Sequence, residues 1–259
     1  MNNTTEYIFE TIEIHWKEID ASIKPSYYVI GISGGIDSTC VAALACRIFG
    51  KDRVVGVSLP CDGQKDMEDV NSVFNYLGIK RYTIDIGDAF NSLLTKCENN
   101  CIEITDVCKT NMPARLRMTT LYGVAQCING FVVNTSNRSE SILGNDTLFG
   151  DNCGSYAPVQ RLVKTEIRNL AEYLGVPSFL VKKIPIDGLQ PLSDEERLGV
   201  SYDDVDAFIR GYHEVPENIV KTILSKYRAN KFKIRMVKIY GPEFLLHDEI
   251  DKREFACDI

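Results

Sequence analysis

The chain has 259 residues, of which 44% are hydrophobic and 25% charged, a composition typical of water-soluble globular proteins. Its net charge of −7 argues against a nucleic-acid partner, because binding to a phosphate backbone requires basic surface. No apolar run approaches the ~20 residues that span a bilayer, and residues 1–6 contain no basic, apolar signal sequence. We therefore expect a cytoplasmic protein without a membrane or nucleic-acid partner.

The predicted elements alternate between helix and strand. Short apolar runs bounded by turn residues predict strands over residues 27–32, 54–59, 82–86 and 131–134. Apolar side chains at helical spacing predict helices over residues 5–23, 39–49, 66–77, 164–174, 202–209 and 216–226. Residues 98–110 are expected to form a loop, residues 184–199 a lid-type loop and residues 231–238 a basic tail.

This alternation predicts a Rossmann-like α/β fold, in which a doubly wound parallel sheet is flanked by helices. We expect one domain, with a nucleotide-binding core over residues 25–180. Residues 181–259 would form the lid loop and a C-terminal helical appendage. Ligands of such sheets bind at the carboxyl ends of the strands, so the loops that follow the strands are the first places to search for a site.

A glycine-rich turn, Ser33-Gly34-Gly35-Ile36-Asp37-Ser38, connects the first predicted strand to the next helix. Glycines let backbone N–H groups approach an anion, and the helix N-terminus adds a partial positive charge. Asp37 cannot bind phosphate itself, because like charges repel, but it could hold a divalent cation that does. A plain turn with Ser38 as the helix N-cap would leave the two glycines and the aspartate unexplained.

Polar residues follow other predicted strands as well. Residues 60–64 and 135–140 form loops at strand ends, and Glu140 could be either a second metal ligand or a capping carboxylate. Lys164 opens a helix against the preference of the helix dipole, which suggests that its ammonium binds a phosphate.

Two arginines lie on the segment Asn111–Met118, whose Pro113 suits a first helical turn. Arg115 and Arg117 are two residues apart, so their side chains diverge around a helix. They form either a solvated basic face or contacts to two different anionic groups, one of them across a subunit interface.

Taken together, these segments resemble those of the ammonia-dependent NAD synthetases, which belong to the N-type ATP pyrophosphatases. The similar segments are Ser33–Ser38, Asn111-x-x-Ala114-Arg115-x-Arg117-Met118, Thr135–Glu140, Thr147–Asp151, Pro158 with Lys164-Thr165, Leu174–Pro177, Asp194-Glu195-x-x-Leu198-Gly199 and Tyr202-x-x-x-Asp206. The resemblance covers nearly the whole chain and is more specific than any one segment.

The resemblance implies an ATP-dependent amidation of nicotinic acid adenine dinucleotide to NAD. Ammonia would be the nitrogen source, an adenylate the intermediate, and AMP and pyrophosphate the other products. Mg²⁺ would be the cofactor, ATP the co-substrate and a homodimer the assembly. No glutaminase domain is recognisable, so we expect free ammonia to support the reaction; a separate protein could still deliver it.

The resemblance also implies roles for particular residues. ATP would contact Gly31, Ser33, Gly34, Gly35, Asp37, Ser38, Gln64, Arg117, Thr135 and Lys164. The nicotinic acid dinucleotide would contact Asn111, Arg115, Asp151, Lys183 and Lys233. Asp37 and Glu140 would hold Mg²⁺, and Asp151 and Lys164 would be the catalytic residues.

Some positions depart from the family pattern. Ile186 stands where the family usually has Ser or Thr, and Ser58 where some members have arginine.

Two alternative functions stay open. One is another pyrophosphatase-loop enzyme, either a GMP synthetase-like amidase or a tRNA-thiolating enzyme. The other is a nucleotide-binding sensor without turnover.

Overall fold

A parallel sheet with strand order β3-β2-β1-β4 lies at the centre of the computed structural model, which describes residues 4–61, 67–183 and 194–250. Its strands are β1 Tyr27–Gly31, β2 Val54–Ser58, β3 Lys80–Thr83 and β4 Gly130–Val132. The chain passes from β1 to β2 to β3 and then returns to place β4 beside the other edge of β1. This is the doubly wound parallel α/β sheet that the sequence predicts.

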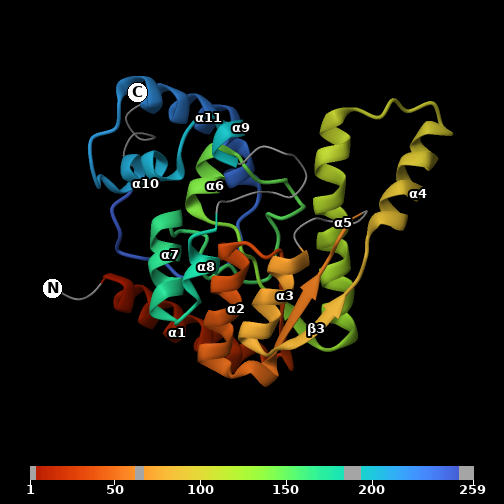
Figure 1. The fold of residues 1–259 in the computed structure, drawn as a ribbon, viewed down its shortest axis with the longest axis horizontal. Coiled ribbons are helices and arrows are strands. Elements are labelled where there is room, and N and C mark those ends of the chain that lie inside the picture. Colours follow the sequence, from red (N-terminus) through yellow and green to blue (C-terminus); the bar gives the residue numbers. More distant parts are fainter. Residues whose placement is uncertain (1–3, 62–66, 184–193, 251–259) are drawn as a thin grey trace.

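The helices are α1 Thr4–Ile23, α2 Ile36–Phe49, α3 Met67–Leu77, α4 Gly87–Glu98, α5 Asp106–Cys127, α6 Arg138–Leu143, α7 Lys164–Tyr173, α8 Ser178–Val181, α9 Asp194–Leu198, α10 Tyr202–Arg210 and α11 Glu217–Met236 (Figure 1). A short 3-10 helix, η1 Lys51–Arg53, precedes β2. Across the described ranges, no helix combines the length and apolar character needed to cross a membrane.

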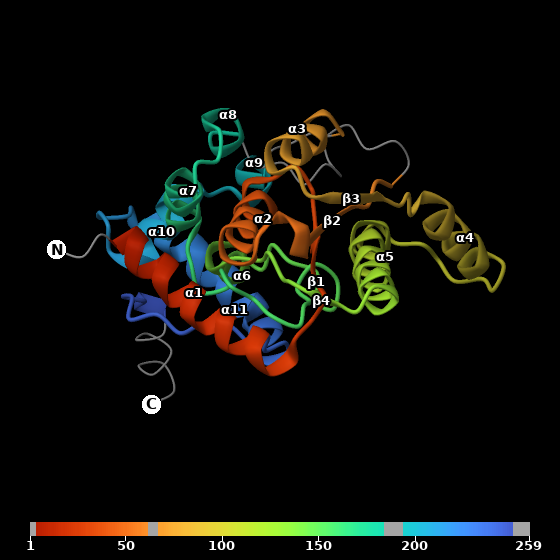
Figure 2. The ribbon, with the colours of Figure 1, turned by 90° about the horizontal axis from the view of Figure 1, so that it is seen from below.

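Strand residues alternate between two cores because successive side chains of a strand point to opposite faces. Tyr28 and Ile30 pack with α1, α2 and α7 on one face of the sheet, whereas Val29 packs with Val55 and Val132 under α5 on the other. Figure 2 shows α2 and α5 on either side of the strands. The two-sided burial explains why β1 and β2 are continuous apolar runs in the sequence.

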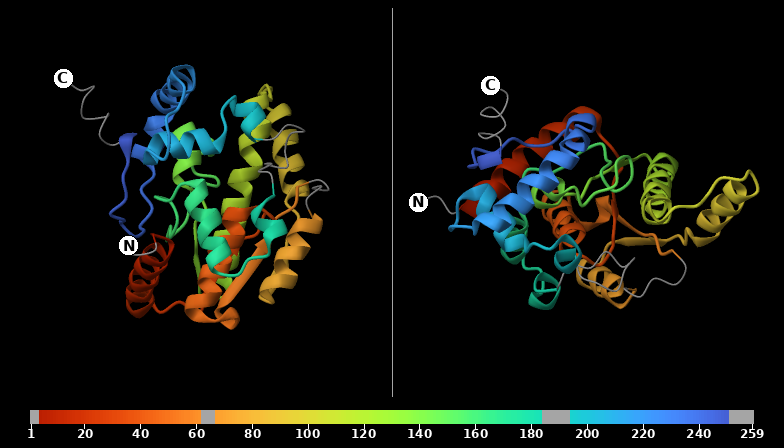
Figure 3. Two further views of the ribbon diagram at one scale, coloured as in Figure 1. Left: turned by 60° about the vertical axis from the view of Figure 1, so that its left-hand side comes forward. Right: turned by 90° about the horizontal axis from the view of Figure 1, so that it is seen from above.

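A third core lies among α6, α9, α10 and α11 and is built around Tyr202, Phe208 and Ile223. Figure 3 shows these green-to-blue elements gathered at one end of the molecule, away from red α1. Helix α6, which follows β4 in the chain, contacts α11, so the C-terminal helices lie near the carboxyl end of β4. The domain boundary at residue 180 stays a prediction.

Three expectations about single elements were wrong. The third strand is Lys80–Thr83 rather than 82–86, because its partner β2 ends at Ser58, just before Pro60. The expected loop 98–110 is shorter and covers only residues 99–105, because α4 continues to Glu98 and Thr105 caps α5 by accepting the N–H of Cys108. Pro113 therefore lies inside α5 instead of in its first turn.

Two further corrections concern the C-terminal part. Residues 194–198 of the expected lid loop form helix α9, while residues 184–193 lie outside the described ranges. The last helix runs to Met236 instead of residue 226, so most of the expected basic tail is helical. Ile234 explains the extension, because it packs against the third core.

Candidate active site

A cavity of about 460 Å³ opens at the carboxyl ends of β1 and β4, where the direction of winding of the sheet changes. This is the position at which doubly wound sheets bind ligands. Most residues singled out from the sequence line it: Gly31, Ser33, Gly35, Asp37, Ser38, Asn111, Arg117, Thr135, Glu140, Asp151, Lys164, Lys183 and Lys233. Side chains from the first and last thirds of the chain therefore meet in one space.

The loop between β1 and α2 is held by its own serines. The N–H of Gly35 donates to Ser33 Oγ at 3.2 Å, and Ser38 Oγ donates to the carbonyl of Gly35 at 3.1 Å. Gly35, not Ser38, is the N-cap residue of α2, and no side chain among the described residues caps this helix with a hydrogen bond. The open helix N-terminus at a cavity is the arrangement that binds anions, so the plain-turn alternative is disfavoured.

Gly34 has a separate, structural reason to be glycine. Its φ of +80° lies in the left-handed region, and a Cβ here would come within 2.9 Å of Asp69 Cβ on α3. The loop thus packs directly on α3, and Gly34 itself is not part of the cavity lining.

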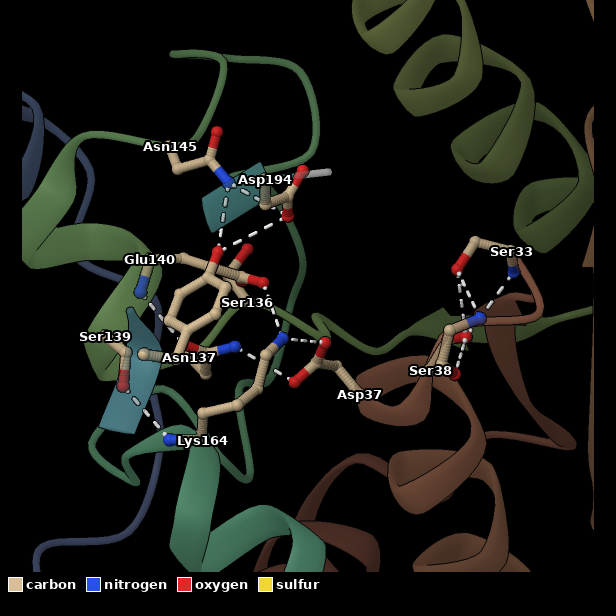
Figure 4. A network of polar contacts seen from close by, with 12 residues as sticks. Ser33, Asp37, Ser38, Ser136, Asn137, Ser139, Glu140, Asn145, Lys164 and Asp194 are labelled. Atoms are coloured by element: carbon tan, nitrogen blue, oxygen red, sulfur yellow. Dashed lines mark hydrogen bonds and ion pairs between the residues drawn. The ribbon is translucent and has the colours of Figure 1, made fainter. Parts of the chain in front are cut away.

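Lys164 joins two carboxylates that the sequence separates widely. Its Nζ donates to Asp37 Oδ2 at 2.6 Å and to Glu140 Oε1 at 3.0 Å, and only 1% of its side chain is exposed (Figure 4). Burial lowers the pKa of Lys164, whereas the carboxylates of Asp37 and Glu140 raise it. The effect of the carboxylates is larger, so the ammonium stays charged. Burial, followed by the charge of Asp37, raises the pKa of Glu140 against the opposing effect of Lys164.

Asn137 fixes this cluster, although the sequence analysis assigned no role to its side chain. Its Oδ1 accepts the N–H of Glu140 at 2.9 Å and so caps α6, while its Nδ2 donates to Asp37 Oδ1 at 2.9 Å. One amide thereby sets the start of the helix that carries Glu140 and orients the facing carboxylate. Its position directly before a helix was a capping signal, but its second contact is visible only in the fold.

Residues 144–152, which we call the 144–152 loop, form the opposite wall of the cavity. Asp151 Oδ1 accepts the N–H of Thr147 at 2.6 Å. The Asp151 side chain is open to the cavity, yet protein surrounds it, and this desolvation raises its pKa to about 6. Asp151 therefore changes its charge closer to neutral pH than an ordinary aspartate.

Lys233 supports this loop from α11. Its Nζ donates to the carbonyls of Gly144 at 2.9 Å and Asp146 at 2.7 Å, and lies 3.3 Å from Asp146 Oδ1. This last distance is an ion pair without hydrogen-bond geometry, since Asp146 Oδ1 has no hydrogen-bond partner in the part of the chain that the structure describes. The lysine is thus engaged by the loop, and Asp146 is a residue that sequence reasoning missed.

The two arginines of α5 diverge as the sequence predicts. Arg117 lines the cavity and donates to the carbonyl of Leu59 at 3.0 Å. Arg115 lies outside the lining and donates to the carbonyl of Leu148 at 3.3 Å. Asn111 accepts a hydrogen bond from Thr147 Oγ1 at 2.8 Å, so α5 holds the 144–152 loop at two points.

Lys183 is paired at the outer edge of the phosphate loop. Its Nζ lies 2.5 Å from Asp69 Oδ2 and 3.5 Å from the carbonyl of Gly34. Gln64 and Ile186, for which the sequence suggested a contact and a missing contact, lie outside the described residues.

Comparison with known proteins decides the family. The family model described as NAD synthase matches residues 10–237. The chain belongs to the NAD synthase family. It is 40% identical over 228 residues to the NH(3)-dependent NAD(+) synthetase of Thermococcus sibiricus, covering 87% of this chain and 86% of the relative.

Solved structures of the family have the same fold. The NMN synthetase of Francisella tularensis superimposes with a TM-score of 0.82 at 31% identity, covering 93% of this chain and 99% of that one. The NH3-dependent NAD synthetase of Campylobacter jejuni gives 0.73 at 26% identity, covering 91% and 98%. Family membership confirms the resemblance seen in the sequence and disfavours the GMP synthetase-like and tRNA-thiolating alternatives.

Proposed function

We propose that this chain is an NAD synthase that amidates nicotinic acid adenine dinucleotide with ammonia at the expense of ATP. AMP and pyrophosphate are the other products. The observation that carries the proposal is that an anion-binding helix N-terminus, a Lys164–Asp37–Glu140 cluster and the Asp151 carboxylate line one cavity of a NAD synthase family member.

In the first half of the reaction, the carboxylate of the nicotinic acid substrate attacks the α-phosphorus of ATP. An adenylate forms and pyrophosphate leaves. The chain needs no nucleophile of its own for this step, because positioning and charge neutralisation lower the barrier. The N–H groups at the start of α2 suit the phosphates, and the Lys164 ammonium offsets charge that develops on the leaving pyrophosphate.

The donor set fits Mg²⁺. Asp37 and Glu140 already converge on one positive charge, the Lys164 ammonium. Within the described ranges, no group of three His, Cys, Asp or Glu side chains is arranged to hold a metal ion. Mg²⁺ is commonly bound by one or two carboxylates together with substrate phosphates and water, so two carboxylates beside a phosphate loop are sufficient. When bound there, Mg²⁺ would neutralise phosphate charge.

In the second half, ammonia displaces AMP from the adenylate to give the amide. Asp151 is suited to orient ammonia or to accept a proton from it, because its raised pKa makes it a better base than an ordinary aspartate. Lys233 and Arg115 bind backbone carbonyls of the 144–152 loop that carries Asp151, and Asn111 binds the hydroxyl of Thr147 in the same loop.

We further propose that the chain forms a homodimer through α4 and the adjoining half of α5. Figures 1 and 2 show α4 standing apart from the body of the molecule beside α5. Gly87 is the one residue of α4 that is buried, and Ile102 and Val107 are 56% and 70% exposed. Apolar surface of this kind on a projecting pair of helices favours contact with a second copy.

The decisive experiment incubates the purified chain with ATP, Mg²⁺, ammonium and nicotinic acid adenine dinucleotide and follows NAD, AMP and pyrophosphate. Equal amounts of the three products are expected. Glutamine in place of ammonium should give no NAD, and omission of the dinucleotide should give no AMP. AMP release without an acceptor, or no turnover at all, would contradict the proposal, the latter in favour of a nucleotide-binding sensor.

A second candidate substrate is nicotinic acid mononucleotide. The NMN synthetase of Francisella tularensis has a higher TM-score and identity with this chain than the Campylobacter jejuni NAD synthetase. The same ATP chemistry would apply, so only the acceptor differs. Comparing kcat/KM for the mononucleotide and the dinucleotide in one assay decides between them.

A further inference from the structure

Tyr202 lies directly against the cluster described above, but the proposed chemistry gives it no role. It is the first residue of α10 and is fully buried. The centroid of its ring lies 4.9 Å from Lys164 Nζ. Within ~6 Å, the negative face of an aromatic ring attracts a cation, most strongly where water is excluded.

The hydroxyl group of Tyr202 faces a different partner set. It accepts a hydrogen bond from Asn145 Nδ2 at 3.1 Å and donates to Asp194 Oδ2 at 3.4 Å. Asn145 belongs to the 144–152 loop and is itself bound by Arg197 at 2.6 Å. In Figure 4, Asn145 and Asp194 lie above Lys164, whereas Ser33 and Ser38 lie to its right, beyond Asp37.

The ring contact differs in kind from the other contacts of Lys164. Asp37 and Glu140 are the carboxylates proposed to bind Mg²⁺, so a metal ion competes with the ammonium for their oxygens. The face of the Tyr202 ring does not bind Mg²⁺ in water. It is therefore the contact that can hold the ammonium while the two carboxylates serve the metal.

From this arrangement we propose that Tyr202 is a positioning residue with two separable functions. Its ring holds the Lys164 ammonium for pyrophosphate release, and its hydroxyl ties the 144–152 loop and α9 to the same point. The proposal deepens the proposed function and rests on it. A substitution that changes the electron density on the face of the ring must therefore change the rate of pyrophosphate release. One that removes the hydroxyl must change the binding of the nicotinic acid substrate.

The hydroxyl is tested with Tyr202→Phe. Single-turnover pyrophosphate release at saturating substrate should change less than about twofold, whereas KM for the nicotinic acid dinucleotide should rise about 2–10-fold, the size of a lost hydrogen bond. Tyr212→Phe is the matched control, because the Tyr212 hydroxyl also bonds a carboxylate, Glu166 Oε1 at 3.2 Å, but lies outside the cavity lining. An unchanged KM in Tyr202→Phe would overturn this half of the proposal.

The ring is tested by replacing Tyr202 with phenylalanine and with its mono-, di- and trifluorinated analogues. Fluorine weakens the negative face of the ring at nearly constant shape. The rate of pyrophosphate release should fall stepwise with the number of fluorines, by about 3–30-fold over the series, while the melting temperature stays close to that of Tyr202→Phe.

The outcomes separate the inference from the function on which it depends. A rate that is independent of fluorine number, or that falls only in proportion to the melting temperature, would overturn the ring function. Absence of pyrophosphate release by the wild-type chain would instead overturn the proposed function. Normal wild-type turnover with a flat fluorine series leaves the enzyme assignment intact and rejects Tyr202 as a positioning residue for Lys164.

Discussion

The ammonium of Lys164 lies 2.6 Å from Asp37 Oδ2, although 127 positions separate the two residues in the sequence. Asp37 stands in the first turn of α2 and Lys164 at the first position of α7, so the N-termini of two helices that pack against each other meet at the cavity. Lys164 places a positive charge at a helix start, which is unfavourable by itself. The two carboxylates beside it compensate for that cost.

Asp37→Asn should nearly abolish pyrophosphate release while leaving the chain folded. The substitution keeps the shape of the side chain but removes the charge that would hold Mg²⁺, and a fall of at least ~10²-fold in kcat is expected. The free energy of unfolding should decrease by ~1–3 kcal/mol, because Lys164 and Asn137 lose a charged acceptor.

The measurements are pyrophosphate release over a range of Mg²⁺ concentrations and a thermal melt. Asp203→Asn is the control, since Asp203 pairs with Arg168 but is 74% exposed and lies outside the lining. Wild-type turnover in Asp37→Asn would remove Asp37 from the metal site.

Lys233→Met should weaken binding of the nicotinic acid substrate more than binding of ATP. Lys233 bridges two carbonyls and a carboxylate of the 144–152 loop, so its loss leaves the buried Asp146 without its cation. We expect a higher KM for the dinucleotide, an ATP KM within about twofold of wild type, and a free energy of unfolding lower by ~1–3 kcal/mol.

The control for Lys233→Met is Lys221→Met on the same helix, because Lys221 is 72% exposed and pairs with Glu217 one turn away. Steady-state kinetics with each substrate varied in turn gives both KM values. A selective rise of the ATP KM would contradict a role of Lys233 in the loop.

Local sequence patterns were sufficient for the phosphate loop but not for the contacts that complete the site. The glycines, serines and aspartate of residues 33–38 reveal their chemistry within six positions. The roles of Asn137, Asp146 and Tyr202 depend on partners far away in the chain, at Asp37, Lys233 and Lys164. No local periodicity encodes such pairings, because the fold brings them together.

Helix α4 is a different case, because a signal was present. Phe90, Leu93, Leu94 and Cys97 follow helical spacing and are each half-buried along one face of α4. This short apolar stripe is difficult to recognise in the sequence, because the rest of the helix is polar and an irregular segment follows it. The length of α5 was harder to predict, because Pro113 inside a helix resembles a helix start.

Glutamate substitutions at Ile102 and Val107 should convert the expected homodimer into a monomer. Both side chains lie on the projecting α4–α5 region, and burying a carboxylate between two apolar surfaces is costly. Light scattering should give twice the 29.1 kDa chain mass for the wild type and the single mass for the double variant. The control carries glutamate at Ile14 and Ile23 of α1, which are 61% and 52% exposed. A monomeric wild type would refute this interface. So would a dimer that persists in the variant with glutamate at Ile102 and Val107.

Asp151→Asn should separate the two halves of the reaction. If Asp151 serves ammonia rather than ATP, single-turnover pyrophosphate release without ammonium should be preserved, and NAD formation with ammonium should slow by ~10²–10⁴-fold. Equal loss of both would instead indicate a role in substrate positioning or metal binding.

The raised pKa of Asp151 gives this prediction a pH signature. The carboxylate is the active form, so wild-type amide formation should be lost as the pH falls through about 6, where Asp151 becomes protonated. Asparagine cannot titrate in this way. The ratio of wild-type to Asp151→Asn rates, measured at equal total ammonium, cancels the titration of ammonia itself and should decrease tenfold per pH unit below that value. A ratio that is constant from pH 5 to 8 would show that the charge of Asp151 is not required in the ammonia step.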